Sequence, residues 1–240
     1  MTTKLNYRSY VANLVTALNV FCGFVSIVLA SEAHYFLAAI FIIAAGIFDS
    51  LDGIVARLLK TSSKFGVELD SLSDVVSFGA APSFLIYKAY LYQFEYLGIA
   101  ISSMILVFGA FRLARFNVQL EDIENKGDFR GLPIPLSAIT LAFFIISFHK
   151  NGMILEPYND FLIPLVILFS FLMVSNIKYN SFPKLKNQSV KRKSAIAIIL
   201  AISLIVSFIT RGEILFYIFF AVILSGLIRS FYNILVNKSK

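Results

Sequence analysis

The sequence predicts an all-α integral membrane protein, and three observations support this. Hydrophobic residues make up 58% of the 240 residues and charged residues 15%, whereas soluble domains are roughly 45–50% apolar and about 25% charged. The mean hydropathy is +0.81. Apolar runs that approach the length of a membrane helix, about 20 residues, recur along the chain. Because a helix satisfies its own backbone hydrogen bonds in lipid, these runs predict transmembrane helices.

Eight apolar segments are candidate spans. The first, at roughly 11–30, carries Asn13, Thr16, Asn19 and Gly23 at helical spacing. Such a polar stripe is unusual in a secretory signal and favours a retained helix. The other segments lie at roughly 35–59, 72–90, 96–114, 134–148, 161–174, 194–210 and 214–236.

The chain divides at a basic stretch that contains a proline. We expect residues 1–182 to form a core of six transmembrane helices and 183–193 to form a cytoplasmic linker. Residues 194–240 then form a C-terminal pair of transmembrane helices, for which the sequence indicates no role.

The distribution of positive charge predicts the orientation. With the N-terminus in the cytoplasm, 18 of the 21 Lys and Arg residues lie on the cytoplasmic side and only Lys88, Lys150 and Arg211 lie outside. This is the bias expected of a plasma-membrane protein, and eight spans then place both termini inside. The net charge of +7 is therefore assigned to cytoplasmic loops and not to nucleic-acid binding. A single cysteine, Cys22, excludes an intrachain disulfide.

Two pairs of aspartates stand out against this apolar background. Asp49 and Asp52 end the second segment, and Asp70 and Asp74 begin the third. Residues three or four apart share a helix face, and the short connection predicts that the two helices are antiparallel neighbours whose carboxylates face each other.

Ionisable groups inside a membrane are expensive and usually functional. Mg²⁺ or Mn²⁺ prefers carboxylate oxygen and often shares its coordination shell with substrate phosphates. Two such ions would balance the four negative charges, so we expect two. The alternatives are a structural cluster capped by Arg57, Lys60 and Lys64, or an ion-conducting path.

Small residues accompany the aspartates. Gly53 and Ala56 follow the first pair, and Gly66 precedes the second. Residues of this size either open space for a bulky ligand or let helices approach closely, and both interpretations remain open.

The complete pattern, D-x2-D-G-x2-A-R-x8-G-x3-D-x3-D, resembles the signature of the CDP-alcohol phosphotransferases. Eight residues form it: Asp49, Asp52, Gly53, Ala56, Arg57, Gly66, Asp70 and Asp74. The resemblance implies a membrane enzyme with a six-helix core, usually homodimeric. Such enzymes transfer a phosphate-bearing group from a CDP-linked donor to an alcohol and release CMP.

Five further stretches resemble the phosphatidylserine synthase branch of that family. They are "NLVTALNVFCG" at 13–23, "FGAAPS" at 78–83, "FRLARFN" at 111–117, "GLPIP" at 131–135 and "LMVSNIKY" at 172–179. The resemblance covers about residues 10–182. It implies that the substrates are CDP-diacylglycerol and L-serine and that the products are phosphatidylserine and CMP.

The resemblance also implies residue roles. Asp49, Asp52, Asp70 and Asp74 would bind the metals, and Asp74 is also the candidate base that accepts the serine proton. The expected donor-binding residues are Asn13, Thr16, Gly53, Ala56, Arg57 and Gly66.

The serine site is less defined by the sequence. A free amino acid needs a cation for its carboxylate, and arginine suits bidentate binding. The candidates are Arg112, Arg115, Asn117 and Arg130, although each arginine is alternatively a topological anchor.

Two other functions compete with this one. Synthases of phosphatidylglycerol phosphate or inositol lipids share the eight-residue signature, and a cation transporter would also use an acidic cluster. A transporter often shows inverted repeats, which this sequence lacks.

Overall fold

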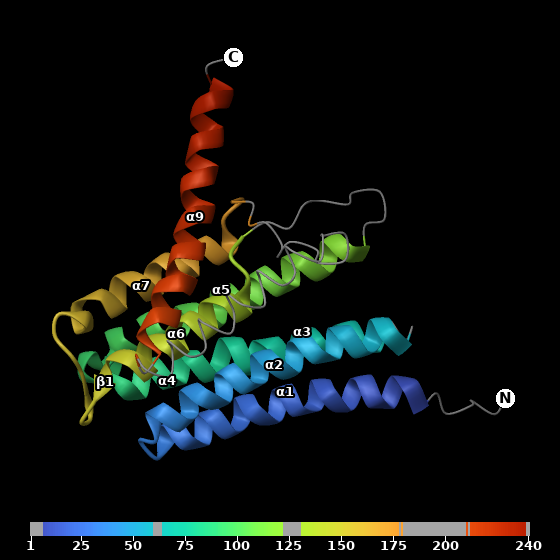
Figure 1. The fold of residues 1–240 in the computed structure, drawn as a ribbon, viewed down its shortest axis with the longest axis horizontal. Helices are drawn as coiled ribbons and strands as arrows, with labels where there is room; N and C mark the ends of the chain where they lie inside the picture. The colour runs from blue at the N-terminus through green and yellow to red at the C-terminus, as the bar shows by residue number, and fades with distance from the viewer. Residues whose placement is uncertain are drawn as a thin grey trace.

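The computed structural model describes residues 7–59, 64–121, 131–177, 179, 210 and 212–238. Figure 1 shows most helices running side by side along one long axis, as expected of a membrane bundle. Large apolar side chains on the outside of the bundle are exposed, among them Phe21, Phe24, Phe36 and Phe111. Such a surface suits lipid and not water, so the predicted all-α membrane class is confirmed.

The first two helices form a hairpin. α1 spans Tyr7–Ser31 and α2 spans Tyr35–Leu59. The turn between them uses Ala33 in the left-handed region, with φ of 64°. The two helices pack against each other along their length (Figure 1).

A helical run of three parts follows. α3 covers Lys64–Asp74, a π-helix labelled η1 covers Val75–Ala80, and α4 covers Ala81–Ala89. The residues at both junctions keep right-handed helical angles, so the run is continuous. The third helix therefore begins at Lys64 and not near residue 72 as predicted. Its polar first turns extend beyond the apolar segment, so hydropathy alone does not detect them.

The remaining described elements complete the bundle. After the short 3₁₀-helix η2 (Leu91–Phe94), α5 spans Glu95–Glu121. α6 (Ile134–Phe148) and α7 (Tyr158–Val174) are joined by a small antiparallel hairpin of β1 (His149–Lys150) and β2 (Met153–Ile154). α6 matches the predicted segment, and α7 begins three residues earlier than predicted.

The final helix, α9, spans Glu213–Lys238 and includes the predicted 214–236. Phe216 packs its ring against Phe144 and Phe148 of α6, with centroids 5.5 and 5.4 Å apart. Figure 1 shows the rest of α9 leaving the bundle steeply. The predicted linker at 183–193 and the predicted span at 194–210 lie outside the described residues, so the division into domains stays a prediction.

Four of the described helical segments are long and apolar enough to cross a membrane, and α6 and α7 are shorter apolar helices. The four are Asn13–Ser31, Tyr35–Val55, Leu91–Gln119 and Glu213–Ser230. The chain is therefore a multi-pass membrane protein, while the total of eight spans remains a prediction.

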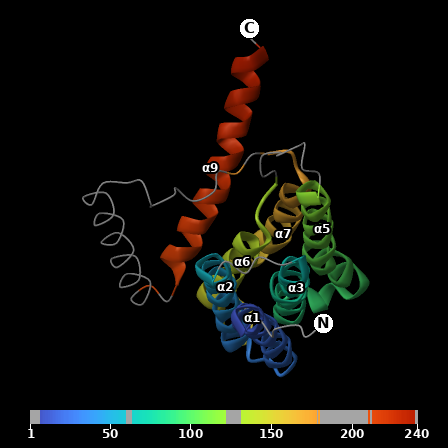
Figure 2. The ribbon, with the colours of Figure 1, turned by 90° about the vertical axis from the view of Figure 1, so that its right-hand side faces the viewer.

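The central run from α3 to α4 contacts α1 and α5 as well as α6, as the end-on view in Figure 2 shows. Its approach to α1 depends on Gly23, where an added Cβ would lie 2.7 Å from the Cα of Ser77. Ser77 in turn donates a hydrogen bond of 2.9 Å to the backbone carbonyl of Asn19. Glycine therefore sets the distance between α1 and η1.

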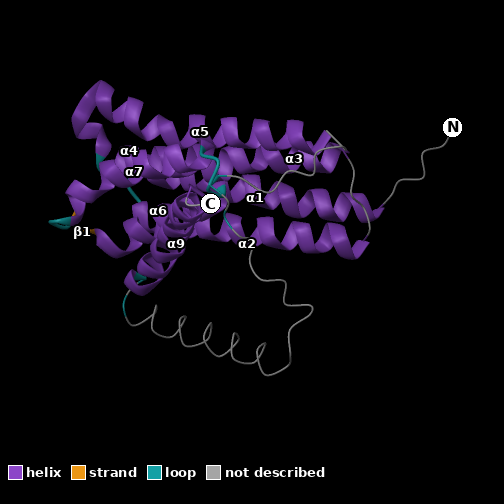
Figure 3. Cartoon of the chain, turned by 90° about the horizontal axis from the view of Figure 1, so that it is seen from above, coloured by secondary structure: helices purple, strands orange, loops and turns teal. Residues whose placement is uncertain are grey.

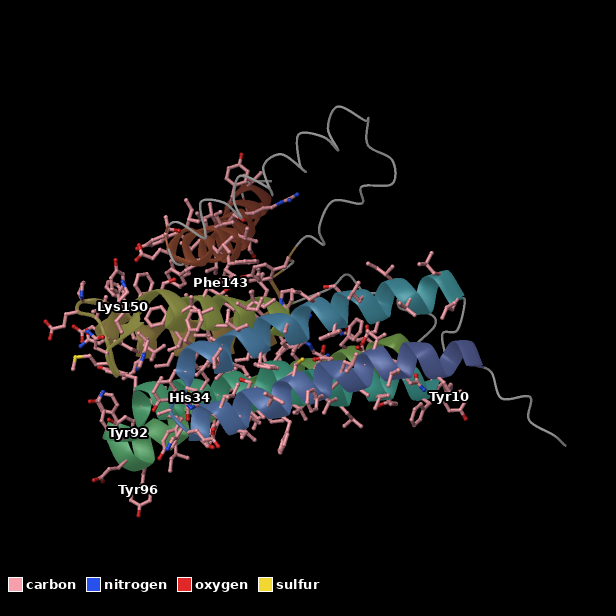
Figure 4. All side chains as sticks on the ribbon, turned by 60° about the horizontal axis from the view of Figure 1, so that its bottom comes forward. Tyr10, His34, Tyr92, Tyr96, Phe143 and Lys150 are labelled. Atoms are coloured by element: carbon pink, nitrogen blue, oxygen red, sulfur yellow. The ribbon has the colours of Figure 1, made fainter. Side chains whose placement is uncertain are left out.

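The bundle has two distinct ends. Figure 4 shows His34, Tyr92, Tyr96 and Lys150 at one end and Tyr10 at the other. Seen from above in Figure 3, α1, α2 and α3 extend together toward the end at which the N-terminus lies. The aspartate-bearing parts of α2 and α3 belong to this N-terminal end.

Candidate active site formed by four aspartates

The aspartates of α2 and α3 converge in space. Carboxylate oxygens of Asp49, Asp70 and Asp74 all lie within 4.8 Å of one another. Asp74 is buried, and Asp49 and Asp70 are half-buried. Helical spacing places each pair on one face, and the packing of the two helices around α1 then directs both faces toward the same space.

Asp52 lies beside this group and is also buried. It accepts hydrogen bonds from the hydroxyl of Thr16 in α1 and from the backbone N–H of Gly53. It also interacts electrostatically with Asp49 and Asp70. Thr16, expected from the sequence to bind donor, is therefore hydrogen-bonded to a member of the aspartate cluster.

The cluster fits a divalent metal ion. One oxygen of each of Asp52, Asp70 and Asp74 is buried and has no hydrogen-bond partner among the described residues. Hard cations such as Mg²⁺ and Mn²⁺ bind oxygen ligands of this kind. Buried carboxylates are strongly unfavourable unless positive charge offsets them, and a bound cation would supply that charge.

The alternative of a structural cluster capped by Arg57, Lys60 and Lys64 gains no support from the described residues. Lys64 is exposed, and no ion pair joins it to a described aspartate. The side chain of Arg57 and the whole of Lys60 lie outside the described part of the chain.

The packing of α2 and α3 differs from the sequence prediction of close neighbours. α2 packs on α1, and α3 contacts α1 and η1, whereas α2 and α3 pack only weakly on each other. Repulsion between the two pairs of carboxylates opposes close packing at this end, and α1 contacts both helices and links them.

Gly53, next to Asp52 in α2, has open space around its Cα. An added Cβ at Gly53 would meet no atom within 4 Å. Close helix packing therefore does not explain this glycine, and of the two interpretations left open by the sequence, space for a ligand fits. Gly66 is half-buried in α3, and the side chain of Ala56 is outside the described set.

We expect the change Gly53→Ala to separate folding from ligand binding. Alanine in a helix is more favourable than glycine by about 1 kcal/mol, and the structure offers room for the methyl group, so thermal stability should be unchanged or higher. The apparent KM for the CDP-linked donor should rise about 10- to 100-fold, because one methyl group in a fitted pocket has effects of this size. Thermal unfolding in detergent and steady-state kinetics measure the two effects.

Ser50→Ala is the matched control, since Ser50 is an exposed neighbour in α2. An unchanged donor KM in the Gly53→Ala protein would remove Gly53 from the binding site.

The three described acceptor candidates differ in their surroundings. Arg112, in α5, is half-buried and close enough to Asp74 for a favourable electrostatic interaction. Its Nε is buried and without a hydrogen-bond partner among the described residues. Arg112 is therefore at the edge of the aspartate site, and its Nε–H is available to donate a hydrogen bond to a ligand.

Arg115 and Asn117 serve contacts between helices. Arg115 donates hydrogen bonds of 3.0 and 3.4 Å to the carbonyls of Val174 and Ser175, at the C-terminal end of α7. Asn117 exchanges hydrogen bonds of 3.0 and 3.2 Å with Ser71. Arg115 thus holds α5 against the end of α7, and Asn117 holds α5 against α3. Arg130 lies outside the described residues.

Ser71 is a site-proximal residue that the sequence pattern does not identify. It follows Asp70 directly and connects α3 to Asn117 across 46 residues of sequence. A serine next to an aspartate, in a helix that also contains Glu68 and Ser73, is a weak signal of such a contact. Asn13, one turn before Thr16, is half-buried on the same side of α1.

Comparison with known proteins agrees with this geometry. The sequence model of the CDP-alcohol phosphatidyltransferase family matches residues 9–172, which include all four aspartates. A Helicobacter pylori protein named CDP-diacylglycerol–serine O-phosphatidyltransferase is 36% identical over 231 residues, covering 95% of each chain. A Bacillus subtilis protein of the same name is 34% identical over 176 residues, which are 73% of this chain and 93% of the relative.

A related archaeal protein, named archaetidylserine synthase, comes from Methanothermobacter thermautotrophicus. It is 40% identical over 185 residues, covering 75% of this chain and 74% of the relative. The extent of the family match and the identities to these relatives show that this chain belongs to the CDP-alcohol phosphatidyltransferase family.

Proposed function

We propose that this protein is a CDP-diacylglycerol–serine O-phosphatidyltransferase, which makes phosphatidylserine and CMP. The observation that carries the proposal is the convergence of Asp49, Asp70 and Asp74, with Asp52 beside them, in a chain that aligns over 95% of its length with a relative of that name. The cluster supplies the metal-binding carboxylates that transfer between phosphates requires.

The proposed reaction is a substitution at phosphorus. The serine hydroxyl oxygen forms a bond to the phosphorus that carries diacylglycerol, and the bond from this phosphorus to the CMP oxygen breaks. The hydroxyl proton passes to Asp74, and CMP leaves with the bonding electrons. A serine hydroxyl is a weak nucleophile at neutral pH, so a proton acceptor at this position accelerates the attack.

The four aspartates would hold two divalent ions, Mg²⁺ or Mn²⁺. When bound, such ions neutralise the donor diphosphate and the charge that develops on departing CMP. The protein positions the reactants: Asp52 is oriented by Thr16 and by the backbone of Gly53. This fixed orientation of the carboxylates contributes because positioning is a large part of phosphoryl-transfer catalysis.

The donor site is proposed to lie between α1, α2 and α3. Gly53 supplies open space beside Asp52, and Asn13 offers a polar side chain one turn from Thr16. Ala56, Arg57 and Gly66 complete the proposed set by their places in the family signature. The acyl chains of the donor remain in the bilayer beside the exposed apolar faces of the helices.

For the acceptor we propose Arg112 as the cation that pairs with the serine carboxylate. Its position next to Asp74 would bring the serine hydroxyl close to the proposed base. Arg115 is less suitable, because it already donates to the carbonyls at the end of α7. Asn117 would act indirectly, through Ser71.

We propose further that the active site faces the cytoplasm and that both termini are cytoplasmic. The supporting observation is the excess of Lys and Arg on the side that carries the aspartates. Tags placed at Lys240 and at Asn151 should then differ in accessibility in intact cells. The family resemblance also supports a homodimer, which cross-linking in native membranes would test.

The product formed by purified protein tests the function. We expect CDP-diacylglycerol, Mn²⁺ or Mg²⁺ and labelled L-serine to yield labelled lipid and an equal amount of CMP. Glycerol 3-phosphate and inositol, offered as competing alcohols, should remain unused. Transfer to glycerol 3-phosphate instead of serine would keep the family chemistry and refute the serine assignment.

A further inference from the structure

Asn19 of α1 is an exceptional residue that the proposed reaction has not used. Its side chain is completely buried, with 0% exposure. Both its amide nitrogen and its amide oxygen lack a hydrogen-bond partner among the described residues. An unpaired buried amide is costly, so an asparagine here indicates a partner outside the polypeptide.

Asn19 is placed next to the aspartate site by the contacts on either side of it. Three residues earlier in α1, Thr16 donates to Asp52. The carbonyl of Asn19 accepts a hydrogen bond of 2.9 Å from Ser77. Ser77 follows Asp74 by three residues, so Asn19 lies just under one helical turn, roughly 4.5 Å along the axis, from the level of Asp74.

Asp74 presents a matching unsatisfied atom. Its Oδ1 is buried and has no hydrogen-bond partner among the described residues. The π-helix η1 begins directly after it, at Val75. Single π-turns often occur at functional sites, and this one carries Ser77 onto Asn19. Two buried polar side chains, each with an atom that has no partner among the described residues, thus lie on contacting helical segments within about one helical turn of each other in depth.

We propose that Asn19 is a positioning residue that holds Asp74 through one buried water molecule. The Asn19 Nδ2 donates to the water, and the water donates to Asp74 Oδ1. A polar site with several partners holds water stably in a protein interior. The other oxygen of Asp74 is then directed at the metal and the serine hydroxyl. Interactions of this kind with a metal-binding group commonly affect metal affinity or activity 10- to 100-fold.

The test compares Asn19→Leu, Asn19→Ser and the control Ser26→Ala. Leucine is similar in size to asparagine but cannot bind water. Serine restores a short polar group. Ser26 is also fully buried in α1 and has an unpartnered hydroxyl among the described residues, but it lies seven residues farther from the cytoplasmic end.

We expect Asn19→Leu to lower kcat about 10- to 100-fold, with the KM for both substrates within twofold of the native value. Affinity for Mn²⁺, measured by electron paramagnetic resonance on the substrate-free protein, should fall by a similar factor. Asn19→Ser should recover most of both losses, and Ser26→Ala should match the native protein. Native protein at high resolution should show an ordered water between Asn19 and Asp74.

A residue that only packs would behave differently. Removing an unpaired polar group would then raise the melting temperature of the Asn19→Leu protein and leave kcat and Mn²⁺ affinity unchanged, which would overturn the proposal. If the leucine variant does not fold, Asn19→Ala takes its place: a 10-fold or greater loss of kcat and Mn²⁺ affinity that Asn19→Ser recovers supports the water bridge, and native-like values in Asn19→Ala overturn it. The expected change in kcat rests on the proposed function. The Mn²⁺ measurement does not, so it tests the role of Asn19 even if serine is not the acceptor.

Discussion

Replacing any one of the four aspartates by asparagine should abolish turnover, with a loss of about 10³-fold or more. Asparagine keeps the size of the side chain but removes the charge that a divalent ion requires. A loss of this size corresponds to about 4 kcal/mol of transition-state stabilisation, within the several kcal/mol that a metal ion typically supplies. The measurements are CMP release and Mn²⁺ binding to purified protein.

The four variants should differ in the cause of the loss. At Asp49, Asp52 and Asp70, metal affinity should fall. At Asp74, the rate should fall more than the affinity, because this carboxylate also accepts the proton. In metal-free protein none of the changes should lower thermal stability, since each one relieves repulsion in a cluster where Asp49, Asp70 and Asp74 have carboxylate oxygens within 4.8 Å of one another and Asp52 lies beside them.

Glu68→Gln provides the matched control, because Glu68 is an exposed carboxylate of the same helix, α3. It should retain normal activity and metal binding. Equal and large losses of metal affinity at all four aspartates would leave the assignment of Asp74 as base without support. Normal turnover in any of the four asparagine variants would contradict the role of the replaced aspartate as a metal ligand.

The second large effect is expected at Arg112. Replacing it by alanine should raise the apparent serine requirement about 100- to 1,000-fold, while the KM for CDP-diacylglycerol changes little. Leaving a buried charge without its partner typically costs about 3–5 kcal/mol, and each tenfold change in affinity corresponds to about 1.4 kcal/mol. Arg112→Lys should restore activity only in part, because the planar fork of the guanidinium is lost.

Arg115→Ala is the informative comparison for this variant. Arg115 is one helical turn further along α5, and its hydrogen bonds go to Val174 and Ser175. Its loss should therefore lower the melting temperature and leave the serine requirement near normal. A normal serine requirement in the Arg112→Ala protein would place the acceptor site elsewhere, with Arg130 the next candidate. An equal rise in the donor KM would instead assign Arg112 to the donor phosphates.

The sequence by itself determined the class of the fold and the two aspartate pairs that form the candidate metal site. Long apolar runs give membrane helices because lipid offers no other partner to the backbone. The spacing of three between Asp49 and Asp52, and of four between Asp70 and Asp74, places each pair on one face because helical periodicity is local. Local sequence also predicted α6, whose apolar run is bounded by Pro133 at its start and by His149 at its end.

Only the tertiary structure decided which partner each of these residues meets. Thr16 reaches Asp52, Arg112 lies near Asp74, and Arg115 is bound to the end of α7. The two arginines belong to one motif and carry the same charge, so their sequence positions do not distinguish them. Their surroundings depend on helices up to 60 residues away. The weak packing of α2 on α3 and the open space at Gly53 likewise belong to the tertiary structure, in which α1 contacts both helices. The periodicity of a single segment does not contain this long-range packing, so the sequence could not predict it.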